Sequence, residues 1–153
     1  MAGYSKTVSD LETHLGYWLR YVSNQVSHAF ALKVQARGVT VAEWVVMRQL
    51  YEAPARPSDL AEQLGMTRGA ISKLADRLVA KRLITRSAAG GDGRAQMLAL
   101  ESEGRAQVPV LAALADRNDE EFFGDLDATT RQTIESAMRE IVRRRGLKAV
   151  PLE

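Results

Sequence analysis

The chain of 153 residues contains no cysteine, and this absence excludes several kinds of chemistry at once. Without thiols there is no disulfide framework, no thiolate zinc site, no cysteine redox switch and no cysteine nucleophile. A protein that depends on none of these suits a reducing compartment, so we expect a cytoplasmic location.

Long apolar runs are lacking as well. No stretch approaches the roughly 18 consecutive apolar residues that indicate a membrane-spanning helix, and the N-terminus has no basic segment followed by an apolar one. We therefore expect a soluble protein with no membrane partner.

The motifs of common enzyme and metal sites are also missing. There is no His-Glu-x-x-His, and the glycine-rich segment Gly90–Gly93 lies between two expected strands, not ahead of a helix as a phosphate loop would. The two histidines, His14 and His28, would lie about 21 Å apart on one helix, too far to share a metal ion. We expect no enzyme activity, no cofactor and no metal site.

The charge is distributed unevenly along a chain of ordinary globular composition. With 46% hydrophobic and 26% charged residues, the sequence predicts a single domain over residues 1–153. Residues 54–99 carry 8 Lys/Arg against 4 Asp/Glu, whereas residues 100–153 carry 8 against 11. A basic central segment attracts polyanions, although a solvated charged surface has the same composition.

Two helices are predicted in the first third of the chain. Apolar residues three and four apart indicate one long amphipathic helix over residues 9–37, which Gly38 ends. Thr40 is placed to cap a second helix through about Glu52. The apolar stripe of the first helix consists of Leu11, Leu15, Trp18, Val22, Val26 and Ala29.

A helix-turn-helix pattern follows the proline-containing segment 53–57. A short helix over residues 58–64 stops at Gly65, and a longer helix over residues 67–81 begins with a threonine as its N-cap. Two short helices joined by a tight turn that contains glycine are typical of this motif. The expected buried stripe of the longer helix is Ile71, Leu74 and Leu78.

A β-hairpin is predicted directly after this motif. Residues 83–87 and 96–100 are predicted as short strands, and the segment between them contains three glycines and an aspartate, which suit turns with positive φ. Two long helices follow, over residues 101–123 and from a cap at Asp127 to about Arg145.

These elements define the expected fold class, which is mostly α with a small β-hairpin wing. A winged helix-turn-helix at about residues 55–100 is flanked by long dimerisation helices at about residues 9–37 and 101–147. The flanking helices are too long and too apolar for the small central motif to cover, so burial against a second copy is expected. A bundle within one chain is the alternative.

The outward side of the helix over residues 67–81 is suited to DNA. Its first two turns contain no acidic residue, which leaves the positive end of the helix dipole open to an anion. Donors opposite the buried stripe can reach guanine edges and phosphates in a major groove, although a solvated helix face is the alternative. The predicted contacts of this helix are Thr67, Arg68, Gly69, Ala70, Ser72 and Lys73.

The hairpin offers a second set of contacts. Arg94 at its tip can enter a minor groove, and Asp92 can hold the guanidinium outward. Each cation outside the tip could also be exposed without touching DNA, so their joint placement carries the prediction. Phosphate contacts that set the register are predicted for Ser58, Lys73, Arg77 and Arg86.

Four short motifs resemble those of the MarR family (multiple antibiotic resistance regulators). They are residues 60–65 (Leu-Ala-Glu-Gln-Leu-Gly), the run 67–78, residues 92–95 (Asp-Gly-Arg-Ala) and residues 103–105 (Glu-Gly-Arg). The resemblance covers about residues 10–147. One departure is Glu101-Ser102, where the family usually has threonine after leucine, so Ser102 is expected to cap the next helix.

The resemblance implies a sequence-specific regulator of transcription, expected to be a repressor. It implies a homodimer built from the first and last helices that binds a near-palindromic operator on double-stranded DNA. The helix over residues 67–81 would be the recognition helix, and Arg94 would be the wing residue in the minor groove.

Regulators of this type often release DNA when a small molecule binds between the dimer helices and the DNA-binding part. Aromatic side chains could stack on an aromatic or phenolic acid while a cation pairs with its carboxylate. The same side chains fit a dimer interface, which is the interpretation that the sequence favours. The candidate ligand residues are His14, Tyr17, Trp18, Tyr21, Trp44 and Arg48.

A winged helix that binds proteins and not DNA is the competing hypothesis, because a fold does not fix a function. An interaction module has no need of a helix face that is free of acids and rich in donors. The sequence therefore favours DNA as the partner.

Overall fold

A computed structural model describes residues 8–88 and 96–148, and it shows a mostly helical chain with one two-stranded hairpin. The predicted fold class is therefore confirmed. The helices are η1 (a 3₁₀ turn, Leu11–Thr13), α1 (Leu15–Gln35), α2 (Val41–Glu52), α3 (Pro57–Leu64), α4 (Arg68–Ala80), α5 (Ser102–Phe123) and α6 (Ala128–Arg145). The strands are β1 (Ile84–Ala88) and β2 (Gln96–Leu100).

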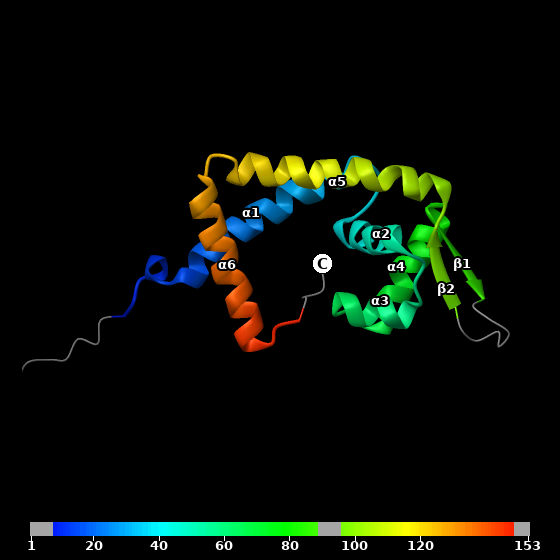
Figure 1. Ribbon diagram of the computed structural model, residues 1–153, viewed down its shortest axis with the longest axis horizontal. Coiled ribbons are helices and arrows are strands. Elements are labelled where there is room, and N and C mark those ends of the chain that lie inside the picture. The colour runs from blue at the N-terminus through cyan, green and yellow to red at the C-terminus, as the bar shows by residue number, and fades with distance from the viewer. Residues whose placement is uncertain (1–7, 89–95, 149–153) are drawn as a thin grey trace, which may run out of the picture.

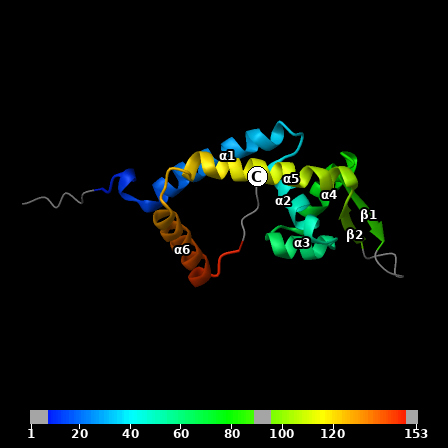
Figure 2. The ribbon, with the colours of Figure 1, turned by 45° about the horizontal axis from the view of Figure 1, so that its top comes forward.

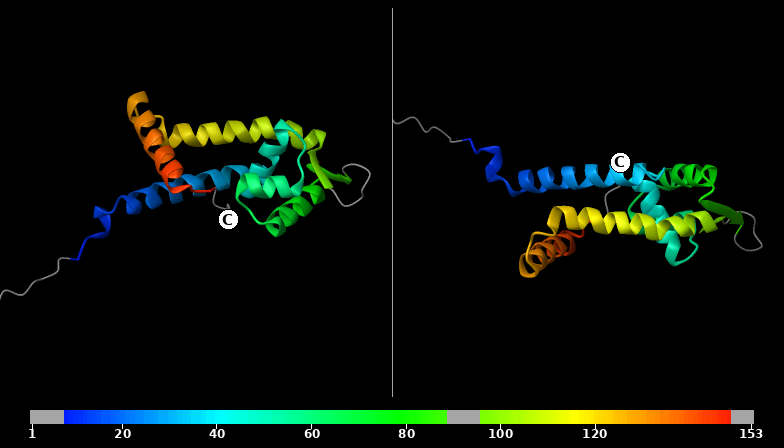
Figure 3. Two further views of the ribbon diagram at one scale, coloured as in Figure 1. Left: turned by 60° about the horizontal axis from the view of Figure 1, so that its bottom comes forward. Right: turned by 90° about the horizontal axis from the view of Figure 1, so that it is seen from above.

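The described residues form two long helices, a small lobe and the separate helix α6. Helices α1 and α5 run alongside each other, and α2, α3, α4 and the hairpin gather at the N-terminal end of α5 (Figures 1 and 2). Helix α6 starts at the other end of α5, the end far from the lobe, and leaves it at a steep angle (Figure 3). No helix within the two described ranges is both long and apolar enough to cross a bilayer.

The core lies in the lobe. Almost fully buried side chains come from α2, α3, α4 and both strands, while α1 adds Val34 and α5 adds Val108 and Leu111. The lobe therefore has a core of its own, and α1 and α5 hold it from one side. The largest of these side chains are Met47, Leu50, Leu60, Ile71, Leu78, Ile84, Leu98 and Leu111.

The first helix starts later than the sequence predicted. His14 has an extended backbone (φ −94°, ψ 126°), so residues before it form the separate turn η1 and α1 begins at Leu15. The hydroxyl of Thr13 donates to the carbonyl of Asp10 at 2.7 Å, a local bond that competes with helix extension. Val34 is the buried residue of α1, and most of the predicted apolar stripe is exposed.

The predicted start of α2 is confirmed. The Thr40 hydroxyl accepts a hydrogen bond from the Glu43 amide (3.1 Å), and the Glu43 carboxylate accepts one from the Thr40 amide (3.4 Å). This reciprocal capping box satisfies two amides that a helix start leaves unpaired. Gly38 lies just before it with φ +82°, the left-handed conformation expected where α1 ends.

The hairpin is tied to the rest of the lobe by a backbone bridge. Strands β1 and β2 pair antiparallel, with Ile84 opposite Leu100. Strand β1 begins one residue later than predicted. Ala55 and Leu98 exchange two backbone hydrogen bonds of 3.0 and 2.8 Å, so the α2–α3 link extends the sheet. Asp92 and Arg94 lie outside the described residues, and their predicted roles stay predictions.

Of the predicted N-caps of the last two helices, the one of α5 is wrong and the one of α6 is confirmed. Glu101, not Ser102, is the N-cap residue of α5, and no side chain caps it; Ser102 is already helical. Asp127 caps α6 as predicted, accepting from the Thr130 amide at 2.7 Å. That hydrogen bond lowers the pKa of Asp127, because it favours the charged carboxylate.

Candidate nucleic-acid interface

Helix α4 presents one buried face and one open face, as the sequence predicted. The Thr67 hydroxyl accepts from the Ala70 amide at 3.1 Å and fixes the helix start. The buried face faces α2, α3 and the hairpin, so the opposite side of the helix is left to solvent. The buried residues are Ile71, Leu74, Ala75 and Leu78.

The open face carries the predicted DNA contacts. No acidic residue lies in its first turn, and the first acid of the helix is Asp76 in the third turn. Ala70 is half-buried beside the open residues, and glycine at position 69 leaves room for close approach of a partner backbone or phosphate. The exposed members are Thr67, Arg68, Gly69, Ser72, Lys73 and Arg77.

The first helix of the motif begins one residue before the predicted start. Pro57 occupies the first helical position, where its missing amide costs nothing, and Ser58 follows it half-buried. Arg56 is the N-cap residue and is exposed, 3.8 Å from the Asp59 carboxylate. The N-terminus of α3 thus carries the Arg56 guanidinium and the Ser58 hydroxyl on either side of Pro57 in the sequence.

Arg86 has a partner that sequence reasoning missed. Its Nη1 donates to the Asp76 carboxylate at 2.8 Å, which joins strand β1 to α4 across ten residues of chain. The ion pair neutralises the acid of α4 and orients Arg86, whose side chain keeps 28% of its surface exposed. The spacing of the two residues alone gave no signal of this contact.

The predicted ligand residues lie in separate places. The Tyr17 ring contacts Trp18 edge-on at 5.3 Å and Tyr21 at 6.2 Å between centroids, near the start of α1. His14 lies beside them, with Nδ1 3.3 Å from the Leu11 carbonyl oxygen. Arg48 pairs with Glu52 at 2.7 Å on α2.

Trp44 is apart from these aromatic residues. It is buried and lines a cavity of about 520 Å³ between α1, α2 and α5, together with Val26, Phe30 and Asn118. Asn118 is itself buried and receives a hydrogen bond from Lys33 Nζ at 3.0 Å. Within one chain the structure does not bring Tyr17, Trp18 and Tyr21 to Trp44, and the ligand site stays a prediction. The described residues contain no group of three side chains that could hold a metal ion.

Helices α3 and α4 and the hairpin together define a class of protein. A helix-turn-helix, an exposed donor-rich second helix and a following hairpin are the parts of a winged helix-turn-helix. Residues 37–95 match the model of the MarR family. The resemblance indicated by the motifs is confirmed: the winged-helix part of this chain is similar to the MarR family of transcription regulators.

Several solved structures share the fold over most of the chain. A probable transcriptional regulator from Pseudomonas aeruginosa is 25% identical, with 86% of this chain and 99% of that one covered and a TM-score of 0.76. A cysteine-to-serine mutant of MarR from E. coli, complexed with operator DNA, is 24% identical (88% and 99% covered, TM-score 0.77). BpsR of Bordetella bronchiseptica, whose DNA binding is regulated by 6-hydroxynicotinic acid, is 21% identical (88% and 96% covered, TM-score 0.77). No curated protein matches the chain.

Proposed function

We propose that this chain is a homodimeric regulator that binds double-stranded DNA sequence-specifically, with α4 in the major groove and the hairpin as a wing. One observation carries the proposal: the outward side of α4 is exposed, free of acid over its first two turns and rich in donors. The E. coli protein of the same fold, which was crystallised with operator DNA, supports DNA as the partner.

Dimerisation is supported by two exposed apolar surfaces. The first half of α1 exposes Leu15, Trp18 and Val22, and 49% of the surface of Trp18 is open to solvent. On α6 none of the residues is buried, and four large apolar side chains are 43–47% exposed. A contiguous exposed apolar surface marks an interaction site, and a second copy would cover both helices. The four α6 side chains are Ile134, Met138, Ile141 and Val142.

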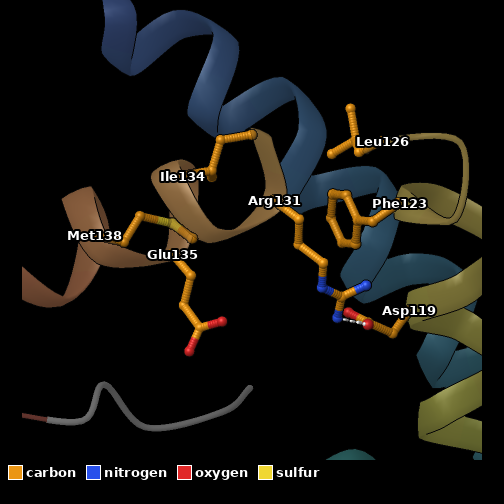
Figure 4. A pocket seen from close by; sticks show the side chains of 7 residues that line it. All are labelled: Asp119, Phe123, Leu126, Arg131, Ile134, Glu135 and Met138. Atoms are coloured by element: carbon orange, nitrogen blue, oxygen red, sulfur yellow. Dashed lines mark hydrogen bonds and ion pairs between the residues drawn. The ribbon is translucent and has the colours of Figure 1, made fainter. Parts of the chain in front are cut away.

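A hollow at the α5–α6 corner continues this surface. It has a volume of about 250 Å³, and Phe123, Leu126 and Ile134 provide its apolar wall (Figure 4). Arg131 reaches across from α6 to the carboxylate of Asp119 on α5 and braces the corner. The brace presents the apolar side of α6 for contact with the partner copy.

We extend the proposal to control by a small molecule. The cavity beside Trp44 lies between the lobe and the α1–α5 pair, where a ligand could alter how the lobe sits on the dimer helices. An aromatic or phenolic acid is the class of effector that we favour, and repression is the mode of action. The regulation of BpsR by 6-hydroxynicotinic acid supports this class.

The cheapest test of the proposed function is the salt dependence of duplex binding. Each phosphate that the protein neutralises contributes roughly 0.9 to the slope of log affinity against log salt concentration. We expect affinity for a random duplex to fall steeply between about 50 and 200 mM salt. Fluorescence anisotropy with a labelled duplex measures this slope.

The same titration separates DNA binding from the protein-interaction alternative. A winged helix that docks only proteins would bind the duplex weakly, with little change across the salt range. That result would remove DNA as the partner of α4.

A further inference from the structure

The C-terminal end of α4 is held by one lysine. Lys81 is the C-cap residue, and its Nζ donates to the Glu43 carboxylate at 2.7 Å and to the Gly38 carbonyl oxygen at 2.8 Å. Gly38 belongs to the turn that follows α1, and Glu43 lies in the first turn of α2. The ammonium therefore joins the ends of three helices.

Glu43 needs this cation because of where it lies. Only 1% of its side chain is exposed, whereas 39% of the Lys81 side chain is open to solvent. A buried carboxylate without a counter-charge is strongly destabilising, while the one capping bond from the Thr40 amide satisfies part of its hydrogen-bonding capacity. Lys81 supplies the opposite charge in the described part of the chain.

The backbone around Lys81 is fixed as well. The amides of Arg82 and Leu83 donate to the carbonyls of Val79 and Leu78 at 2.9 and 3.0 Å, closing α4 with a Schellman motif. Arg82 has φ +59° there, a conformation that ordinarily favours glycine. The turn aims Lys81 at the α1–α2 corner, where its ammonium finds its two acceptors.

We propose that Lys81 is a positioning residue for DNA binding, which sets the recognition helix on the α1–α2 corner through the buried carboxylate of Glu43. Within residues 8–88 and 96–148, its two bonds are the only hydrogen bonds from α4 or its caps to the α1–α2 segment. Since α1 carries part of the proposed dimer surface, the position of each recognition helix relative to its partner depends on this contact. The inference rests on the proposed DNA-binding function.

A direct phosphate contact by Lys81 is the competing role. Two facts disfavour it: both acceptors of its ammonium lie within the protein, and the residue lies about 20 Å along the helix from Arg68. Lys73, by contrast, is exposed on the open face and is predicted to contact phosphate.

Three variants of the full chain separate the two roles. Lys81→Met removes the charge and keeps the length of the side chain. Glu43→Gln removes the buried charge and keeps an oxygen for the capping bonds. Lys73→Met is the matched control, because it removes a cation from the same helix with no partner at Glu43.

Binding to an operator selected with the parent protein is measured well below each variant's melting temperature. We expect Lys81→Met to weaken binding roughly tenfold, a coupling ordinary for contacting residues. Adding Glu43→Gln should restore most of that loss, because no buried charge is then left unpaired and the packing of α4 on α2 can hold the helix in place. The slope of log affinity against log salt concentration should be the same for Lys81→Met as for the parent. Lys73→Met should lower the slope by about 0.9, and Glu43→Gln should not rescue it.

The proposal is overturned if Lys81→Met binds like the parent, or if it lowers the salt slope and Glu43→Gln restores nothing. Should Lys81→Met fail to fold, Glu43→Gln is compared with the double variant, which must bind within about threefold of it, because Lys81 then has no buried charge to act through. A larger difference refutes the coupling. Failure of the parent to bind any duplex refutes the proposed function instead.

Discussion

Replacing Gly104 by alanine is expected to destabilise the protein by about 3 kcal/mol, at the upper end of overpacking substitutions. A Cβ at this position would lie 2.1 Å from the Leu83 carbonyl oxygen and 3.1 Å from Cδ2 of Leu100. The Leu83 oxygen cannot easily retreat, because it accepts the Glu101 amide at 2.9 Å where α5 begins. Helix α5 would have to move away from the root of the hairpin.

Thermal unfolding followed by circular dichroism measures this effect. A loss of this size lowers the melting temperature by roughly 10 °C in a chain of this length. Gly69→Ala is the matched control, because the nearest atom to its added Cβ is Thr67 Oγ1 at 4.0 Å. Alanine in an exposed helix should stabilise by about 0.5–1 kcal/mol. Equal melting temperatures for Gly104→Ala and the parent would contradict the close packing of α5 on the hairpin.

Charges on the apolar side of α6 are expected to convert the dimer to a monomer. Met138 and Ile141 are 46% and 47% exposed within one chain, so Met138→Glu with Ile141→Glu leaves the core of the lobe untouched. In the dimer the same two carboxylates would be buried without partners. We expect loss of the dimer in sedimentation and operator affinity at least about a hundredfold lower, because two linked half-sites bind far more tightly than one.

The control places the same two charges on the other side of α6. Gln132 and Ser136 are exposed and lie opposite the apolar side by the 3.6-residue repeat. Gln132→Glu with Ser136→Glu should remain dimeric. If Met138→Glu with Ile141→Glu also stayed dimeric and bound its operator normally, the proposed interface would be wrong.

Features set by neighbours in the sequence could be predicted. Thr40, Thr67 and Asp127 are caps whose partners lie three residues away, and Gly65 ends α3 with φ +65°. The buried stripe of α4 follows from helical periodicity alone. These local rules predict which side of α4 is exposed, and that side carries most of the predicted DNA contacts.

Features set by distant contacts could not be predicted. Lys81 and Glu43 are 38 residues apart, and Ala55 meets Leu98 across more than 40 residues, so no spacing rule links them. The pairing of Arg86 with Asp76 likewise depends on how β1 leaves α4. Periodicity showed that the α1 stripe is apolar but not whether one chain or two would bury it. The start of α1 was missed because apolar spacing continues through the extended residue His14.

The most direct test of DNA recognition by α4 compares the parent with Arg68→Ala on a library of single-base changes around the selected operator. We expect a near-palindromic site whose half-sites lie about 10–10.5 base pairs apart. Arg68→Ala should cost about 1–3 kcal/mol and relax the preference at one position of each half-site, with an unchanged melting temperature because the side chain is exposed. An operator without two-fold symmetry, or an Arg68→Ala profile identical to that of the parent, would contradict this mode of recognition.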